Sequence, residues 1–463
     1  MPTKTGLLLA KLAQLRPLNA RSLTVYTNVF QSVFIKGLGI LIGFLTIPLT
    51  LRYISVGDFG IWMTITFLTS WFSLVDVSFG NGLRNSLVLF FDTGDTHTAR
   101  RYVSTLYCLS GMVALALAGT FLTIGQRLDW TRLLTIQSEN PAQVNGIITY
   151  TLVGFSVQLL LKPITSILLA DQKAALAGWI LLGSNVITVA IIFFGDSYLD
   201  KSLLTIAHIY NLVPIGVLAL VSVYLFARQY ASIAPGFAHI DLSLSHELVT
   251  VGGKFFVLQL ISVLVFTSGG LFISYFLGSG QVGPYSVANK YFSVITVLYG
   301  IIITPYWSAF TDAYVKRDSA WIDQTLRQLN RISAGMTVLA GFMLLAANTV
   351  FNLWIGSAIS VPGSLSVWLT AYVTSFIFLS NYNSIINGTG QVNRLVKFSL
   401  VGVLLYVVLI VVLFRWFEAG PASVVIAGTA WNVTLLLVCR AEYRKLLNQM
   451  TPLNTRCPAP SPF

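Results

Sequence analysis

About twelve apolar stretches of membrane-spanning length fill residues 28–441, and this pattern constrains the fold more than any other feature. Crossing the hydrocarbon core of a bilayer takes roughly 20 apolar residues per helix. Because lipid cannot satisfy backbone hydrogen bonds, we expect an all-α integral membrane protein. The predicted spans are residues 28–51, 58–79, 102–124, 144–169, 174–195, 202–227, 254–277, 285–310, 331–354, 364–386, 398–417 and 420–440.

The second six spans resemble a weak copy of the first six. The alignment that places Gly60 on Gly283 also places Asp95 on Asp318. Each copy has an even number of spans, so both copies cross the membrane in the same direction, and their pseudo-two-fold axis runs along the membrane normal. Two similar six-helix bundles with a cavity between them indicate a transporter.

The formal net charge of +12 is best explained by membrane topology. Most lysines and arginines fall on the same side of the membrane as the N-terminus, which is typical of the cytoplasmic side. Both termini are therefore predicted to be cytoplasmic, and a nucleic-acid partner is not expected. The predicted parts are a cytoplasmic N-terminal segment at 1–27, a six-helix lobe at 28–227, a cytoplasmic connecting loop at 228–252, a second six-helix lobe at 253–441 and a cytoplasmic tail at 442–463.

The sequence has no pattern typical of a cofactor, a metal site or an enzyme. Its three cysteines and four histidines lack the spacing of metal ligands. It also contains no P-loop, dinucleotide fingerprint or nucleophile elbow. We therefore expect no cofactor, no metal and no direct use of ATP.

Two helices predicted to be repeat partners carry polar stripes at helical spacing. The stripe of span 58–79 contains Thr66, Thr69, Ser73 and Asp76, and that of span 285–310 contains Ser286, Asn289, Ser293 and Thr296. Lipid cannot satisfy such groups, so the stripes should face protein or water. They are interpreted either as the lining of an aqueous cavity or as hydrogen-bonding contacts between helices.

Two lysines lie within predicted spans. Lys36 is about 12 Å along its span at 1.5 Å per residue, and Lys290 lies nearer the outer end of span 285–310. An isolated charge at such a depth costs at least ~2.5 kcal/mol. Each lysine is interpreted as a cavity-facing cation that meets a phosphate group, or as a side chain that snorkels to the interface.

Other charged residues near the cytoplasmic ends of the spans have two interpretations each. Asp76 is either a carboxylate that couples transport to an ion or an interfacial, ion-paired aspartate. Arg84 and Asn85 form either an anion site or part of the ordinary positive-inside pattern. Pro48 in the first span and the paired glycines 269–270 in the seventh predict weakened helices at corresponding places.

Several motifs resemble the multidrug/oligosaccharidyl-lipid/polysaccharide exporter superfamily, and within it polysaccharide transporters and O-antigen flippases of the Wzx type. In the first half the motifs are FLTIPL at 44–49, GDFGIW at 57–62 and GNGLRN at 80–85. In the second half they are GPYSVA at 283–288, PYWSAF at 305–310 and NGTGQ at 387–391. The resemblance covers roughly residues 25–440.

The resemblance implies a V-shaped pair of six-helix bundles in the bacterial inner (plasma) membrane. It implies a flippase that moves an undecaprenyl-diphosphate-linked oligosaccharide to the outer leaflet by alternating access, with the lobes rocking about the 228–252 connection. The process would be O-antigen or exopolysaccharide biosynthesis, driven by an ion or substrate gradient, with a glycan polymerase as a partner. In this reading Lys36, Lys290, Arg84, Asn85 and Asn289 contact the substrate.

Two other functions stay open on the sequence. A cation-coupled exporter of drugs or small molecules would favour buried carboxylates, for which Asp76 is the sole candidate within the spans. A membrane polysaccharide polymerase or ligase would need catalytic groups in an outer loop, and the longest such loop, 125–143, offers few.

Overall fold

The computed structural model describes residues 20–71, 87, 95–171, 173–244, 260–261, 263–389, 393–417 and 419–450. In these ranges the regular structure is helical and includes no strand. Ten stretches among the described residues are long and apolar enough to span a membrane, and they coincide with ten of the predicted spans. The other two predicted spans, 58–79 and 254–277, run partly outside the described residues. The prediction of an all-α, multi-pass membrane protein is confirmed.

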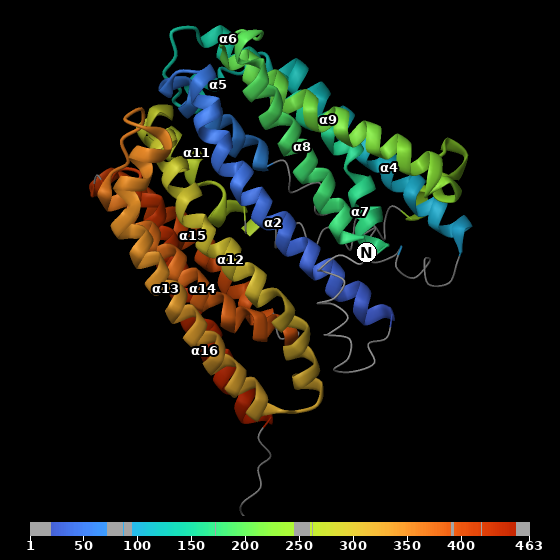
Figure 1. Ribbon diagram of the computed structural model, residues 1–463, viewed down its shortest axis with the longest axis vertical. Coiled ribbons are helices and arrows are strands. Elements are labelled where there is room, and N and C mark those ends of the chain that lie inside the picture. The colour runs from blue at the N-terminus through green and yellow to red at the C-terminus, as the bar shows by residue number, and fades with distance from the viewer. Residues whose placement is uncertain are drawn as a thin grey trace, which may run out of the picture.

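The helices form two bundles, drawn from blue to green and from yellow to red in Figure 1. The first bundle contains α2 (Ala20–Tyr53), the unlabelled helix 56–71, α4 (Thr96–Thr120), α6 (Pro141–Leu161), α7 (Pro163–Ala170), α8 (Ala174–Phe194) and α9 (Leu203–Arg228). The second contains α11 (Gly269–Leu277), α12 (Val282–Val315), α13 (Ser319–Ile355), α14 (Gly363–Thr389), α15 (Asn393–Trp416) and α16 (Ala422–Met450). The π-helical turn η1 (Phe121–Gly125) and the short helix α5 (Trp130–Leu133) connect α4 to α6.

Equivalent helices of the two bundles begin in the same way. Asp95 accepts a hydrogen bond from the Thr98 N–H at 3.0 Å, and Asp318 accepts one from the Trp321 N–H at 2.9 Å. Such a cap satisfies a backbone N–H that has no partner inside the helix. Asp95 and Asp318 are the residues that the internal alignment pairs, so the shared cap supports a duplicated architecture.

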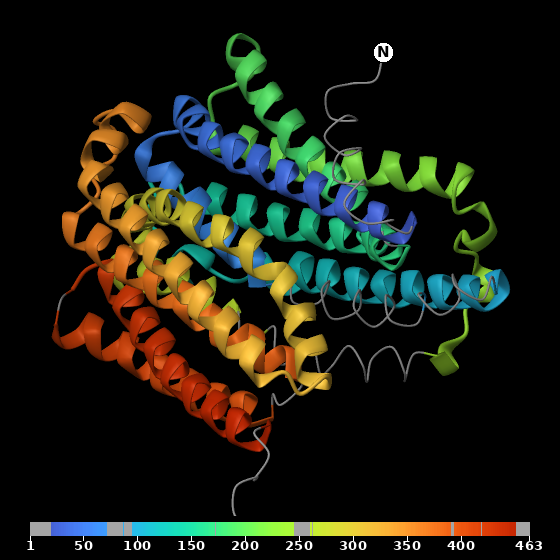
Figure 2. The same cartoon turned by 60° about the horizontal axis from the view of Figure 1, so that its bottom comes forward.

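One hydrophobic core joins the bundles at one end of the molecule and is replaced by two separate cores at the other. The largest cluster of buried side chains contains Ile148 of the first bundle and Phe292 of the second. A cluster around Val103 belongs to the first bundle alone, and one around Phe310 belongs to the second alone. We call the end with the shared core the closed end, and the end with the two separate cores the open end. Figures 1 and 2 show the bundles diverging toward the open end, which gives the molecule the expected V shape.

Two segments that the internal alignment matches, at the beginnings of helix 56–71 and of α12, pack against each other at the closed end. Gly60 lies against the backbone of Ser279, where an added Cβ would be 3.0 Å from the carbonyl carbon. Gly283 lies against the ring of Phe59, where an added Cβ would be 3.4 Å from the nearest ring carbon. The lack of a side chain at Gly60 therefore allows the two bundles to approach closely.

Hydrogen bonds also hold the closed end together. The Ser274 hydroxyl of α11 donates to the carbonyl of Leu134 at 2.6 Å. The Thr135 hydroxyl donates to the carbonyl of Tyr275 at 3.1 Å. The loop after α5 thus belongs to the contact between the bundles.

The predicted weak points of the helices behave differently in the two bundles. The helix α2 continues through Pro48. In the second bundle the helix is interrupted by a turn at Thr267 and Ser268, where both backbone N–H groups donate to the carbonyl of Val263. The interruption comes directly before Gly269, where α11 begins. The break near the paired glycines is therefore present, and the residue pair that forms it is Thr267–Ser268.

The connection that follows α9 is fastened to the beginning of α4. Its described residues form the 3-10 turns η3 (Ala231–Ile233), η4 (Phe237–His239) and η5 (Leu242–Leu244). Arg100 Nε donates to the carbonyl of Ala234 at 2.9 Å, and Arg101 forms an ion pair with Asp241. Two backbone N–H groups of the connection donate to hydroxyls of α4: Gly236 to Ser104 Oγ at 3.1 Å and Asp241 to Thr105 Oγ1 at 3.0 Å. The described part of the connection is therefore attached to the first bundle.

Acid is expected to loosen this connection. Hydrogen bonds from the Ser243 hydroxyl and backbone N–H, together with Arg101, lower the pKa of Asp241. A carboxyl with a lowered pKa stabilises the folded state above its unfolded pKa of about 3.9 and loses that contribution as the pH falls through the folded value. The protection of the backbone amides in 234–244 against hydrogen exchange, taken relative to the intrinsic exchange rate at each pH, should therefore fall below about pH 4. Equal protection at pH 7 and pH 3, or an unchanged profile in Asp241→Asn, would contradict this.

Candidate functional site

Two of the sequence-predicted residues, Lys36 and Lys290, line one pocket between the bundles. Its volume is about 180 Å³. The helix α2 contributes Lys36, Gly39 and Phe44, and α12 contributes Lys290 and Ser293. Lys36 is exposed and Lys290 is half-buried. We call this the lysine pocket. The two cations come from different bundles, so a ligand held by both bridges the bundles.

Gly43 determines where the Lys290 side chain lies. A Cβ added to Gly43 would be 2.7 Å from Lys290 Cε, and the Nζ of Lys290 contacts the same place. The side chain of Lys290 thus crosses the surface of α2 at a position that only glycine leaves open. Gly39 has open space beside it, consistent with its place in the pocket wall.

The charges of the lysine pocket are uncompensated within the described part of the chain. The ion pairs found there involve neither Lys36 nor Lys290. A cation removed from water is costly unless an opposite charge or a hydrogen-bond acceptor meets it. The pocket therefore suits an anionic group, and two ammonium groups suit one with several oxygen atoms, such as a phosphate or diphosphate.

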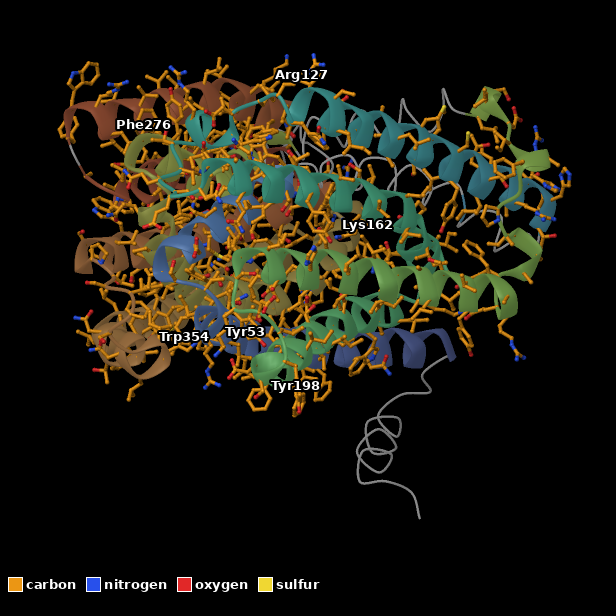
Figure 3. The ribbon with its side chains drawn as sticks, turned by 90° about the horizontal axis from the view of Figure 1, so that it is seen from above. Tyr53, Arg127, Lys162, Tyr198, Phe276 and Trp354 are labelled. Carbon is orange, nitrogen blue, oxygen red and sulfur yellow. The ribbon has the colours of Figure 1, made fainter. Side chains whose placement is uncertain are left out.

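A hydrogen bond between the bundles lies beside the pocket. The Trp354 indole N–H at the end of α13 donates to the carbonyl of Phe44 in α2 at 2.8 Å, and the two rings pack with centroids 4.5 Å apart. In a helix the carbonyl of residue 44 would normally accept from the N–H of residue 48, but Pro48 has none. Trp354 therefore takes the place of the missing donor. Figure 3 shows Trp354 and Tyr53, the last residue of α2, near the same end of the molecule.

The hydroxyl groups of the predicted stripes mostly bond to their own helix. Thr66 donates to Trp62, Thr69 to Thr66, Ser293 to Lys290 and Thr296 to Ser293, at 2.7 to 2.9 Å. These groups are locally satisfied, and each oxygen can still accept a hydrogen bond. Ser286 is buried and its hydroxyl has no partner in the described structure, while Asn289 is half-buried. Of the two stripes, the pocket includes Ser293.

The two striped helices meet at the closed end. Phe67 of helix 56–71 faces Tyr285 of α12 with ring centroids 6.0 Å apart. Phe67 also packs on Gly270, where an added Cβ would lie 2.7 Å from Phe67 Cγ and would overlap the edge of the ring. At the lysine pocket itself, the helix that faces α12 is α2. The sequence indicated Lys36 on that helix but not the pairing of α2 with α12.

Four predicted site residues lie outside the described residues: Ser73, Asp76, Arg84 and Asn85. Their predicted roles therefore stay predictions. Among the residues that are described, no group of His, Cys, Asp and Glu side chains has the arrangement of a metal site.

Solved structures with a similar shape show which fold this is. The inward-facing conformation of a MATE family multidrug resistance transporter of the MOP superfamily matches 89% of this chain and 95% of its own, with 14% identity and a TM-score of 0.74. A MOP superfamily transporter from Pyrococcus furiosus matches 91% of this chain and 96% of its own, with 14% identity and a TM-score of 0.64. An outward-facing MATE transporter matches over the same shares with 14% identity and a TM-score of 0.57.

The chain is thus a multi-pass membrane protein with the two-bundle fold of MOP superfamily transporters, and these structural neighbours are transporters. The family model described as "Polysaccharide biosynthesis protein" matches residues 25–311, and the chain belongs to this family. No curated protein sequence matches the chain.

Proposed function

We propose that the protein is a flippase for a lipid-linked oligosaccharide, and that the lysine pocket holds the diphosphate of that substrate. The observation that carries this proposal is the meeting of Lys36 and Lys290, from different bundles, at one pocket without a carboxylate partner among the described residues. An undecaprenyl-diphosphate-linked glycan has the anionic group that such a pocket needs. Membership of a polysaccharide biosynthesis family supports the same substrate class.

The proposed state of the molecule is open to the cytoplasm. The positive-inside pattern places the N-terminus inside, and α2, which runs toward its end at Tyr53 near the closed end, begins on the opposite side of the molecule. A substrate made on the cytoplasmic leaflet would then reach the lysine pocket from the open end. For transport, the closed-end contacts must separate and the open ends must approach each other.

The lobes are proposed to rock about the 228–252 connection. Residues 231–244 of this connection are fastened to α4 by Arg100 and Arg101, so they would move with the first bundle. The lobes themselves are proposed to be 28–227 and 253–441.

Asp76 is proposed to couple the motion to an ion gradient. The expected result of Asp76→Asn is a loss of the proton or sodium dependence of glycan export, because the neutral amide cannot bind and release the ion. Export measured in cells before and after collapse of the gradient checks this. Undiminished surface glycan with an unchanged response to the gradient would remove Asp76 from the mechanism.

The closest rival is an exporter of drugs or other cations with the same fold, as the MATE neighbours illustrate. A pair of lysines repels cations, which favours the anionic substrate. The deciding experiment is deletion of the gene with measurement of surface glycan, lipid-linked intermediates and drug susceptibility. We expect lost surface glycan and accumulated lipid-linked oligosaccharide. Unchanged glycan with increased drug sensitivity would support the exporter instead.

A further inference from the structure

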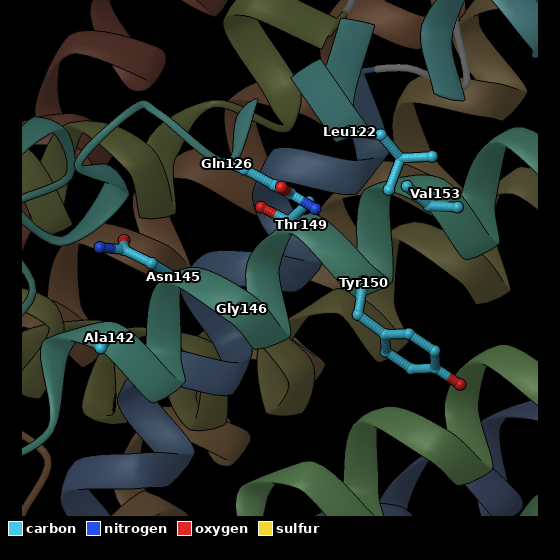
Figure 4. Close-up of a pocket in the computed structure, with 8 residues that line it drawn as sticks. All are labelled: Leu122, Gln126, Ala142, Asn145, Gly146, Thr149, Tyr150 and Val153. Atoms are coloured by element: carbon cyan, nitrogen blue, oxygen red, sulfur yellow. The ribbon is translucent and has the colours of Figure 1, made fainter. Parts of the chain in front are cut away.

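A second pocket, of about 520 Å³, lies in the first bundle between the end of α4 and the beginning of α6 (Figure 4). Its volume is within the range of small-molecule sites in proteins, about 300 to 1,000 Å³. The residues that define its chemistry are Leu122, Gln126, Asn145, Thr149, Tyr150 and Val153. We call it the α4–α6 groove. It is separate from the lysine pocket, with which it shares no residue.

The hydroxyl of Thr149 is a buried polar group of this groove that lacks a hydrogen-bond partner in the described structure. The Thr149 residue is 5% exposed. Threonines elsewhere in these helices instead donate to the carbonyl four residues earlier; examples are Thr46, Thr50, Thr64, Thr66 and Thr151. A buried hydroxyl without a partner costs free energy. Because Thr149 lines the groove, a ligand there can satisfy it.

The lining has no ionisable acid or base other than the phenol of Tyr150. Amide and hydroxyl groups that both donate and accept are the partners that an uncharged, hydroxyl-rich ligand needs. Figure 4 shows Gln126 and Thr149 on the same side of the groove. Tyr150 points toward α9, where its ring meets that of His208 at 5.0 Å.

Polarity changes along the groove from the helix ends toward the middle of the helices. Gln126 lies just beyond the end of η1, and Asn145 lies near the beginning of α6. Asn145 also accepts the Thr131 N–H at 3.1 Å, which fixes this rim to α5. Leu122 and Val153 lie farther from those helix ends. The gradient matches an amphiphile whose headgroup is at the membrane surface and whose chain points into the lipid.

We propose that the α4–α6 groove binds the carbohydrate of a lipid-anchored glycan at the membrane surface next to the closed end. The proposal rests on the proposed function for its substrate class and adds a second site outside the lysine pocket. Given the positive-inside topology, this surface is the outer one. A sugar held there by Thr149 and Gln126 would be in position to receive the glycan after the closed end opens.

The test is saturation-transfer-difference NMR on the full chain in lipid nanodiscs. The probes are methyl glycosides of glucose, N-acetylglucosamine and rhamnose, with glycerol phosphate as the headgroup probe. We expect glycoside signals from the wild type that weaken on the order of fivefold in Thr149→Val, because one neutral hydrogen bond is lost. Thr151→Val is the matched control on the same helix, since the Thr151 hydroxyl already donates to Ile147 at 2.8 Å. Gln126→Leu, at an exposed position, is the second variant should Thr149→Val disturb folding.

The outcomes separate the groove from the lysine pocket. The double variant of Lys36 and Lys290 should lose export and keep the glycoside signal. Equal signals from the wild type, Thr149→Val and Gln126→Leu would overturn the proposal, as would binding of glycerol phosphate alone, which would identify an ordinary lipid headgroup. The glycoside signal could depend on Thr149 while deletion of the gene leaves surface glycan intact. That result would support carbohydrate binding in the groove and reject the proposed flippase function.

Discussion

Replacing both Lys36 and Lys290 with alanine is expected to reduce glycan export on the order of a hundredfold while the protein stays in the membrane at its normal level. A hydrogen bond to a charged group contributes about 1.5 to 3 kcal/mol, so each lysine accounts for about a tenfold effect or more. The two side chains line the same pocket from opposite bundles. The loss in the double variant should therefore exceed that of either single variant.

Surface glycan per membrane-inserted protein is the measurement, made in a strain whose own gene is deleted. Lys316→Ala is the matched control, because Lys316 follows directly after the last residue of α12, is exposed and is ion-paired with Asp312. Lys36→Arg should keep more export than Lys36→Ala, because the positive charge remains. Normal export by the double alanine variant would reject the lysine pocket as the diphosphate site.

The fold could be predicted from the sequence because a membrane helix is recognisable from its own length and apolar composition. The internal alignment paired Asp95 with Asp318, and the structure shows that each of them caps the beginning of a helix. The sequence also marked Lys36 and Lys290, because a charge within an apolar span is conspicuous. Their meeting in one pocket was not predictable from spacing, since it depends on how α2 and α12 cross.

Other parts of the site carry no signal in the sequence. Thr149 looks like every other helical threonine, and the structure alone shows that its hydroxyl lacks a partner. The stripe pattern included both Ser293, which lines the lysine pocket, and Thr296, which is not among its lining residues. Pro48 implies a free carbonyl at residue 44, but the donor, Trp354, lies 310 residues away in the chain. Contacts at such separation are set by tertiary packing, which periodicity does not encode.

The bond between Trp354 and Phe44 is expected to stabilise the contact between the bundles, and Trp354→Phe should weaken it. The substitution keeps an aromatic ring against Phe44 but removes the donor, so the carbonyl freed by Pro48 is left without a partner. An unsatisfied group of this kind costs about 1 to 3 kcal/mol, and the population with the closed end intact should fall on the order of tenfold or more relative to the opened one.

Pro48→Ala provides the sharpest test of that mechanism. Alanine restores an N–H at residue 48, which can donate to the Phe44 carbonyl within α2. In this background Trp354→Phe should cost little, so the effects of the two substitutions should be clearly non-additive.

Spin-label distances across the closed end, measured for the wild type, both single variants and the double variant, give the four populations. Additive effects would mean that the indole acts through packing with the Phe44 ring. A closed-end population in the double variant near that of Pro48→Ala alone would identify the indole as the substitute for the donor that proline removes. The same proline that leaves α2 short of a hydrogen bond would then provide the point at which the second bundle holds it.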